Sequence, residues 1–320
     1  MRKERLSLKG FFQIFKESLS RFGEDKVPKL SGSLAYSTLF SLAPLLIVII
    51  SLFGIFLGKE AIEGKIFDQL NGFFGTDTAS QLQEIIKNAS LSGKSNMAAI
   101  IGGVILLIGA TAIFSEIQDS INGIWGIKPM PRKGWLKFLQ NRFLSFSIIV
   151  GLGFLLLVSL VINTFIESFN SRLHQWIPGM SIILIYTINI FITIVIVTMI
   201  FGFIFKVLPD ADIQWRDVIA GAFVTALLFM LGKFLISFYI SKSNIGSTFG
   251  AAGSLVILLL WVYYSSIILY FGAEFTKSWA MKYGLPIAPN LYAVTTKMVE
   301  VETGQATVQE NDKKADEVKS

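Results

Sequence analysis

Long apolar runs alternate with polar links along most of the chain, and six of these runs are long enough to cross a bilayer as helices. A helix needs about 20 apolar residues to span the hydrocarbon core of a membrane. The pattern therefore predicts an all-α fold, a polytopic membrane helix bundle with six transmembrane helices. The predicted spans are residues 33–57, 97–119, 142–166, 178–205, 216–240 and 249–276.

Two other parts of the chain place apolar residues at helical spacing but carry too many charges to span a membrane. Residues 10–24 gather phenylalanines on one helical face and charged side chains on the other, which predicts an amphipathic helix. This helix would lie in the membrane interface with its apolar face inserted, or pack that face against the bundle. The link over residues 58–96 repeats the pattern twice, so two short amphipathic helices are expected to cap the bundle there.

Three regions follow from this pattern. Residues 1–30 form an N-terminal segment with the interfacial helix, residues 31–282 form the six-span membrane domain, and residues 283–320 form a polar tail. The tail has no hydrophobic periodicity and is predicted to be disordered and cytoplasmic. The N-terminal segment lacks the short apolar core and cleavage site of a signal peptide, so the first span is expected to remain in the mature protein.

Composition and charge set the orientation of the predicted bundle. Hydrophobic residues make up 53% of the chain and charged residues 16%, with a mean hydropathy of +0.63, which indicates a chain that needs lipid as its solvent. Most of the 28 Lys and Arg residues lie in the N-terminal segment, in alternate links and in the tail. The positive-inside rule then places both termini in the cytoplasm. Topology and contact with anionic lipid explain these basic residues, so we expect no nucleic-acid partner.

Catalytic and metal-binding motifs are scarce in this sequence. It has no cysteine and one histidine, His174, and it contains no P-loop, no G-x-S-x-G and no H-E-x-x-H pattern. Asp210 and Asp212 form a D-x-D pair that could hold Mg²⁺, but two carboxylates in a loop are a weak signal. We therefore expect no enzyme activity, no cofactor and no bound metal.

Hydroxyl-bearing side chains interrupt the first and last predicted spans. Small residues at four-residue spacing are typical of close helix packing, and the same hydroxyls could instead line a polar path. A tyrosine hydroxyl in lipid needs a partner, so at least one tyrosine of the last span is expected to face the bundle interior. Together with a lysine in the fifth span, the candidate polar path comprises Tyr36, Ser37, Ser41, Lys233, Tyr263, Tyr264 and Ser265.

Three residues within the spans are unusual for a lipid environment. Lys233 would cost about 2.5–3.5 kcal/mol at mid-membrane, unless it reaches towards the headgroups, pairs within the bundle or meets an anionic ligand. Pro44 removes the backbone hydrogen bond to Phe40, which predicts a kink that is either a hinge for gating or a static bend. Glu274 lies three residues before Lys277, and an ion pair between them at the membrane interface is its expected role.

Four segments resemble, in the expected order, the YihY/BrkB family of bacterial inner-membrane proteins, formerly labelled the ribonuclease BN family. They are "SGSLAYSTLFSLAPLLIVI" (31–49), "GATAIFSEIQDSINGIWGIKP" (109–129), "KVLPDADIQWRDVIAGAFVTALLFMLGKFLISFYI" (206–240) and "FGAAGSLVILLLWVYYSSIILYFGAEFT" (249–276). The resemblance covers roughly residues 10–282 and implies a six-span, multi-pass protein of the bacterial cytoplasmic (inner) membrane. It supplies no agreed catalytic residues, although members have been linked to serum resistance and to envelope-related transport.

Three functions are compatible with this reading. The leading hypothesis is transport, flipping or organisation of a lipid or another amphiphilic envelope molecule, with anionic membrane lipids as partners. The second is a non-transporting membrane scaffold, and a homo-oligomer or an envelope protein partner is compatible with either. The third is the tRNA 3′ processing of the older family label. It is disfavoured, because zinc-dependent RNA processing needs clustered histidines and carboxylates that this chain lacks.

Overall fold

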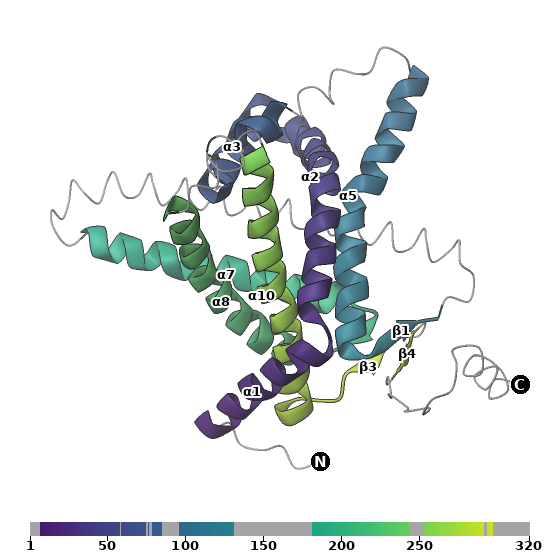
Figure 1. Ribbon diagram of the computed structural model, residues 1–320, viewed down its shortest axis with the longest axis vertical. Coiled ribbons are helices and arrows are strands. Elements are labelled where there is room, and N and C mark those ends of the chain that lie inside the picture. The colour runs from purple at the N-terminus through teal and green to yellow at the C-terminus, as the bar shows by residue number, and fades with distance from the viewer. Residues whose placement is uncertain are drawn as a thin grey trace, which may run out of the picture.

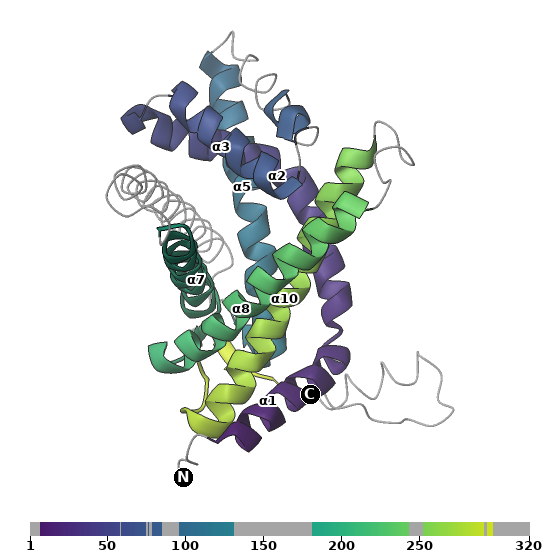
Figure 2. The same ribbon diagram turned by 90° about the vertical axis from the view of Figure 1, so that its left-hand side faces the viewer.

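The computed structural model describes residues 7–57, 59–74, 76, 79–84, 96–130, 181–242, 252–290 and 293–296. Within these ranges the protein is mostly helical, with long helices leaning against one another and short strands at one end (Figure 1, Figure 2). In chain order the elements are α1 (Leu8–Glu24), α2 (Val27–Leu57), α3 (Lys59–Phe74), α5 (Asn96–Trp125), β1 (Ile127–Pro129), α7 (Ser181–Val207), β2 (Ala211–Asp212), α8 (Trp215–Lys242), α10 (Gly253–Tyr283), β3 (Ala288–Pro289) and β4 (Ala293–Thr295).

Five long helices, α2, α5, α7, α8 and α10, lie where the apolar runs predict spans, and the predicted span over 142–166 lies outside the described residues. Among the residues that the structure describes, four stretches are long and apolar enough to cross a membrane. They are Val27–Ile47, Ile190–Val207, Trp215–Ile236 and Gly253–Tyr283.

The main apolar core lies at the end of the bundle that carries α1 and the strands, which we call the α1 end (Figure 1). There the C-terminal halves of α5, α7 and α10 meet the N-terminal half of α8. Ile121, Phe205 and Leu208 are almost fully excluded from solvent in this core. Large side chains from several helices thus fix the relative positions of the elements at this end.

A second, smaller core closes the opposite end of the bundle, where α3 lies. Leu46 and Ile50 of α2 pack there with Leu70 of α3 and with Leu82. The predicted capping helix in the first half of the 58–96 link is therefore confirmed as α3. The second predicted helix is represented by helical residues 79–84, and its remainder lies outside the described residues.

Reciprocal glycine–threonine pairs bring α8 and α10 into close contact. A Cβ atom on Gly221 would lie 1.8 Å from the Thr276 hydroxyl oxygen, and one on Gly272 would lie 2.0 Å from that of Thr225. Each threonine hydroxyl donates to the carbonyl of the glycine one turn earlier in its own helix, at 2.7 Å. The two helices thus run antiparallel, and each glycine leaves space for a threonine whose hydroxyl is already satisfied.

Pro44 lies in the interior of α2, and the helix continues beyond it to Leu57. Its ring packs on α5, because a Cβ atom on Gly109 would lie 2.9 Å from the proline Cγ. The proline is therefore part of a helix–helix contact, which supports the static bend among the two interpretations of this residue. A gating hinge at Pro44 stays a prediction.

Two small antiparallel sheets tie the C-terminal part of the described chain to the α1 end. Strand β4 pairs with β1, and strand β3 pairs with β2. Gly126 adopts φ = +68°, and its carbonyl accepts the Thr296 N–H at 2.7 Å. Part of the predicted polar tail thus forms the strands β3 and β4, where no regular structure was expected, and the domain boundary at residue 283 stays a prediction. Two- and three-residue strands are too short to show the alternation that marks a strand in sequence.

The predicted amphipathic helix at the N-terminus is present as α1, and it packs against the bundle. Ser7 caps it by accepting the Gly10 N–H at 3.0 Å. The Phe11 and Phe15 rings lie 5.5 Å and 5.2 Å from phenylalanine rings of α10, between ring centroids. Phe12 lies outside this contact and is 70% exposed. Of the two expectations for this helix, docking on the bundle is observed, and insertion into the membrane interface stays a prediction.

Candidate functional site

One tyrosine of the predicted polar path, Tyr264, packs on the α8 backbone next to the lysine of that path, Lys233. Lys233 lies inside the apolar stretch of α8 and is partly buried. At the preceding residue, Gly232, a Cβ atom would lie 2.4 Å from a ring carbon of Tyr264 and 2.7 Å from its hydroxyl oxygen. The Tyr264 hydroxyl therefore rests on the α8 backbone next to Lys233. Only a glycine at position 232 allows this approach.

The other residues of the predicted path differ in exposure. Tyr263 and Ser265 of α10 are partly buried, as is Ser37 of α2, and Ser41 is 4% exposed. Tyr36 is 65% exposed and lies against the exposed Phe40 ring, with 5.0 Å between ring centroids. The structure thus packs Tyr264 against Gly232, the residue before Lys233, and Tyr36 faces outward from α2.

Each carboxylate of the D-x-D pair has a partner of its own. The Asp210 carboxylate accepts from the side-chain amides of Gln118 and Asn122 at 3.3 Å and 3.0 Å. The Asp212 carboxylate lies 3.3 Å from the Lys206 ammonium. These contacts hold the link between α7 and α8 against α5. Within the described ranges, no three histidine or acidic side chains gather as they would around a metal ion.

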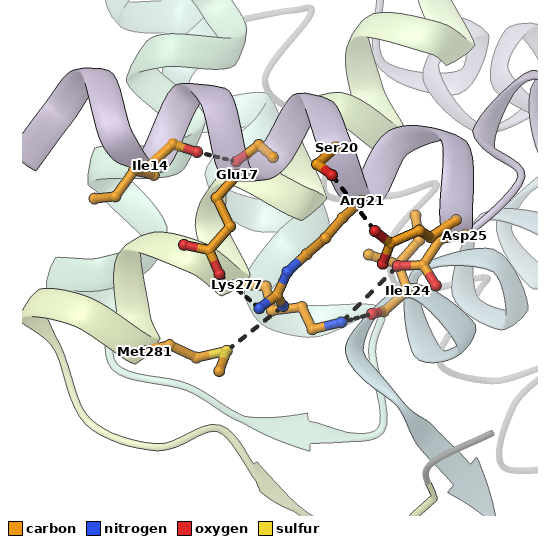
Figure 3. Close-up of polar contacts among 10 residues, drawn as sticks. Ile14, Glu17, Ser20, Arg21, Asp25, Ile124, Lys277 and Met281 are labelled. Atoms are coloured by element: carbon orange, nitrogen blue, oxygen red, sulfur yellow. Dashed lines mark hydrogen bonds and ion pairs between the residues drawn. The ribbon is translucent and has the colours of Figure 1, made fainter. Parts of the chain in front are cut away.

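A second polar cluster lies at the α1 end, and we call its four members Arg21, Asp25, Glu274 and Lys277 the Glu274 cluster. Figure 3 shows Lys277 reaching from α10 towards the main-chain carbonyl of Ile124 and the carboxylate of Asp25. The Lys277 ammonium lies 4.0 Å from the Asp25 carboxylate, and Arg21 lies 2.7 Å from Glu17 one turn earlier on α1. The two cations are thus both engaged by groups other than Glu274.

Glu274 is completely buried, which differs from the interface position expected from the sequence. Neither of its carboxylate oxygens has a hydrogen-bond partner among the described residues, and the structure shows no ion pair with Lys277. The predicted ion pair is therefore wrong. The prediction failed because other groups in the fold engage Lys277: α1 brings Asp25 next to its ammonium, and the Ile124 carbonyl at the end of α5 accepts its hydrogen bond.

Tyrosine and serine hydroxyls continue this cluster along α10. Tyr270, one turn before Glu274, is 0% exposed, and Ser278, one turn after it, is 1% exposed. This confirms the expectation that a tyrosine of the last span faces the bundle interior. Both the role of Asp25 and the polar face of α10 were missed from the sequence. The four-residue spacing of Tyr270, Glu274 and Ser278 could have revealed that face, whereas no local pattern points to Asp25.

The sequence is also similar to a defined group of bacterial membrane proteins. The family model described as virulence factor BrkB matches residues 18–289. The chain belongs to the BrkB virulence-factor family. A UPF0761 membrane protein of Haemophilus influenzae is 26% identical over 275 residues, covering 85% of this chain and 96% of the relative. Another, from Pseudoalteromonas translucida, is 29% identical over 264 residues, covering 81% and 83% respectively.

No solved structure matches the chain at a significant level. The family match includes both polar features described above, since the BrkB region spans the contact at Lys233 and the whole Glu274 cluster. The names of the curated relatives state membrane location and no activity. This BrkB-family chain is thus an integral membrane protein, and its chemistry has to be argued from its own residues.

Proposed function

We propose that this BrkB-family protein transports, flips or organises an amphiphile with an anionic headgroup, without enzymatic turnover. The observation that carries the proposal is the partly buried Lys233, which lies within the apolar stretch of α8 and next in sequence to Gly232, where the Tyr264 hydroxyl of α10 approaches the α8 backbone. A lysine near mid-membrane costs about 2.5–3.5 kcal/mol on insertion scales, and an anionic partner offsets that cost. The tyrosine hydroxyl can donate a further hydrogen bond to a phosphate or carboxylate oxygen.

The proposed setting is the bacterial cytoplasmic (inner) membrane, with six spans and both termini in the cytoplasm. The unequal distribution of Lys and Arg over the links supports this orientation. Figure 1 adds that α1 and the C-terminal strand β4 lie at the same end of the bundle. Under this orientation, Lys233 lies in the half of the membrane that faces away from the cytoplasm.

Lipid mass spectrometry on protein purified gently from its own membrane tests the proposal. We expect an anionic lipid to be enriched over bulk membrane in the wild type and in Lys233→Arg, which keeps the charge. Hydrogen bonds to charged groups contribute about 1.5–3 kcal/mol, so Lys233→Ala should reduce the bound lipid roughly tenfold or more. Tyr264→Phe should reduce it less. A bound pool that matches bulk lipid in every variant would contradict the proposal.

A membrane scaffold is the second candidate, and the outer face of α1 favours it. Phe12 and Leu19 are 70% and 58% exposed there, although the opposite face of the helix is docked on α10. The scaffold predicts that Phe12→Ser with Leu19→Ser abolishes complementation of a deletion strain, whereas Lys233→Ala complements normally. The transport proposal predicts the opposite result for each variant.

The tRNA-processing alternative gains least from the structure. The carboxylates of Asp210 and Asp212 are directed at Gln118, Asn122 and Lys206, and these contacts account for both acids. Purified protein that trims tRNA only while both aspartates are intact would restore this alternative.

A further inference from the structure

Buried polar groups without hydrogen-bond partners form a line along α10. The Tyr270 hydroxyl, both carboxylate oxygens of Glu274 and the Ser278 hydroxyl have no partner among the described residues. They follow one another at four-residue intervals, so they lie on one face of the helix. Ser31 of α2, which packs against α10, has a buried hydroxyl in the same condition. Since most buried polar atoms are paired, such a group calls for a missing partner.

The charges around Glu274 do not balance if its carboxyl is ionised. Arg21 forms an ion pair with Glu17, and Lys277 lies by Asp25 while donating to a main-chain carbonyl. These two pairs are each neutral, and they leave the charge of an ionised Glu274 uncompensated. A buried carboxylate with neither hydrogen bonds nor a counter-charge is strongly unfavourable.

Among the residues that the structure describes, the remaining elements packed around this face show no further positive charge paired with Glu274. From α5, Glu116 acts on the neighbouring Tyr270 and is itself an acid. At the start of α2, Lys26 and Lys29 are exposed. Among the described residues, the charged side chains that act on Glu274 are Asp25, Lys277 and Arg21, and all three are paired as described above.

We propose that Glu274 is a proton-binding site, with its carboxyl group neutral and protonated in the conformation described. One proton removes the uncompensated charge. It also converts an acceptor-only carboxylate into a group that can donate to the Asp25 carboxylate or to a serine hydroxyl. A proton fits better than a metal cation, because the Lys277 ammonium already provides the positive charge next to Asp25. This inference is independent of the proposed lipid function.

Proton occupancy would act directly on the joint between α1 and α2. Asp25 follows α1 immediately, and its N–H donates to the Arg21 carbonyl at 2.8 Å. Lys26 then adopts φ = +53°, a conformation that fixes the turn into α2. The Asp25 carboxylate is therefore fixed to the end of α1. Loss of the proton from Glu274 would put a second negative charge near this carboxylate, so the electrostatic energy at the joint depends on whether the proton is bound.

Labelling with dicyclohexylcarbodiimide tests the proposal on the full-length protein in detergent. The reagent modifies carboxyl groups that are protonated and in apolar surroundings. The carboxyl proton passes to a carbodiimide nitrogen, the carboxylate oxygen adds to the central carbon, and an acyl shift gives a stable N-acylurea. Peptide mass spectrometry should find Glu274 modified at neutral pH and the modification lost at alkaline pH. The exposed Glu24 is the internal control and should stay unmodified.

Two charge variants separate protonation from simple access of the reagent. Asp25→Asn removes the competing anion, so Glu274 should lose its proton more readily and its labelling should disappear at a lower pH than in the wild type. Lys277→Gln removes the neighbouring cation and should move the loss of labelling to a higher pH. Identical labelling profiles in the wild type and both variants would overturn the proposal.

Infrared difference spectra of Glu274→Gln against wild type supply a second readout. The wild type should show the carbonyl stretch of a protonated carboxylic acid, and the variant should lack it. Absence of that band from the wild type, together with an unlabelled Glu274, would overturn the proposal. Protection from the carbodiimide by sodium chloride at constant pH, without protection by choline chloride, would overturn it in favour of a sodium ion.

Discussion

The side-chain amide of Asn122 makes two of the hydrogen bonds that hold the link between α7 and α8 against α5. It donates to the Asp210 carboxylate at 3.0 Å and accepts the Asp210 N–H at 2.8 Å, and it is 2% exposed. Asn122→Ala removes the acceptor of the partly buried Asp210 N–H and one of the two amides that donate to the Asp210 carboxylate. This costs about 1–3 kcal/mol and should lower the thermal unfolding midpoint in detergent. Asp212→Asn is the control, because its carboxylate is 78% exposed and an exposed pair contributes roughly 0–1 kcal/mol. An equal drop in the unfolding midpoint for Asn122→Ala and Asp212→Asn would contradict the expectation that the contacts of Asp210 stabilise the fold more than those of Asp212.

At this scale the sequence identified unusual residues better than it identified their partners. Lys233 and Glu274 were singled out as charged side chains within apolar runs, and Asp210 was singled out with Asp212 as a possible Mg²⁺ pair. Their partners lie on other helices, as with Asp25 near Lys277, and no local pattern reports such a contact. The expected pair of Glu274 with Lys277 was the nearest choice in sequence, and the docking of α1 replaced it with a pair from far along the chain.

At the scale of elements, the close contact between α8 and α10 depends on glycines, which have no side chain and leave space for a threonine of the facing helix. Gly272→Ala would put a Cβ atom 2.0 Å from the Thr225 hydroxyl oxygen, and overpacking of this kind costs about 1–3 kcal/mol. The exchange variant, Gly272→Thr with Thr225→Gly, should recover part of the loss, since it moves the same atoms to the other helix. Gly123→Ala is the matched control: nothing lies within 4 Å of its Cβ position, so stability should hold or rise. Equal thermal unfolding midpoints for Gly272→Ala and Gly123→Ala would contradict the close contact between α8 and α10.

The elements themselves followed from the apolar pattern wherever they were long. Helices α2, α5, α7, α8 and α10 occupy predicted spans, because a run of about 20 apolar residues has few alternatives to a helix in lipid. The strands were not predicted, since β2 and β3 have two residues each and β1 and β4 have three. Short pairings of this kind are decided by which links the bundle brings together, and that information is not local.

At the scale of the whole molecule, one end of the bundle gathers the features that the sequence located separately. The docked helix α1 and both small sheets lie at the α1 end (Figure 1). The main core and the Glu274 cluster lie there too, and Figure 3 shows Arg21, Asp25 and Lys277 of that cluster. Lys233 belongs to the part of α8 beyond this core. The lipid and proton proposals therefore concern two separated places on α8 and α10, which the glycine–threonine contact joins into one unit.

The orientation of this unit can be measured directly, because the chain contains no cysteine. Single-cysteine variants at Ser20 on α1, Thr295 on β4 and Ser80 near α3 all place the thiol at an exposed position. Since basic links are retained on the cytoplasmic side, a membrane-impermeant maleimide should label Ser80→Cys in intact spheroplasts. The same reagent should label Ser20→Cys and Thr295→Cys only after permeabilisation, and the cysteine-free wild type should stay unlabelled throughout. The reverse pattern would invert the proposed topology, and opposite behaviour of the variants at Ser20 and Thr295 would contradict a shared side for α1 and β4.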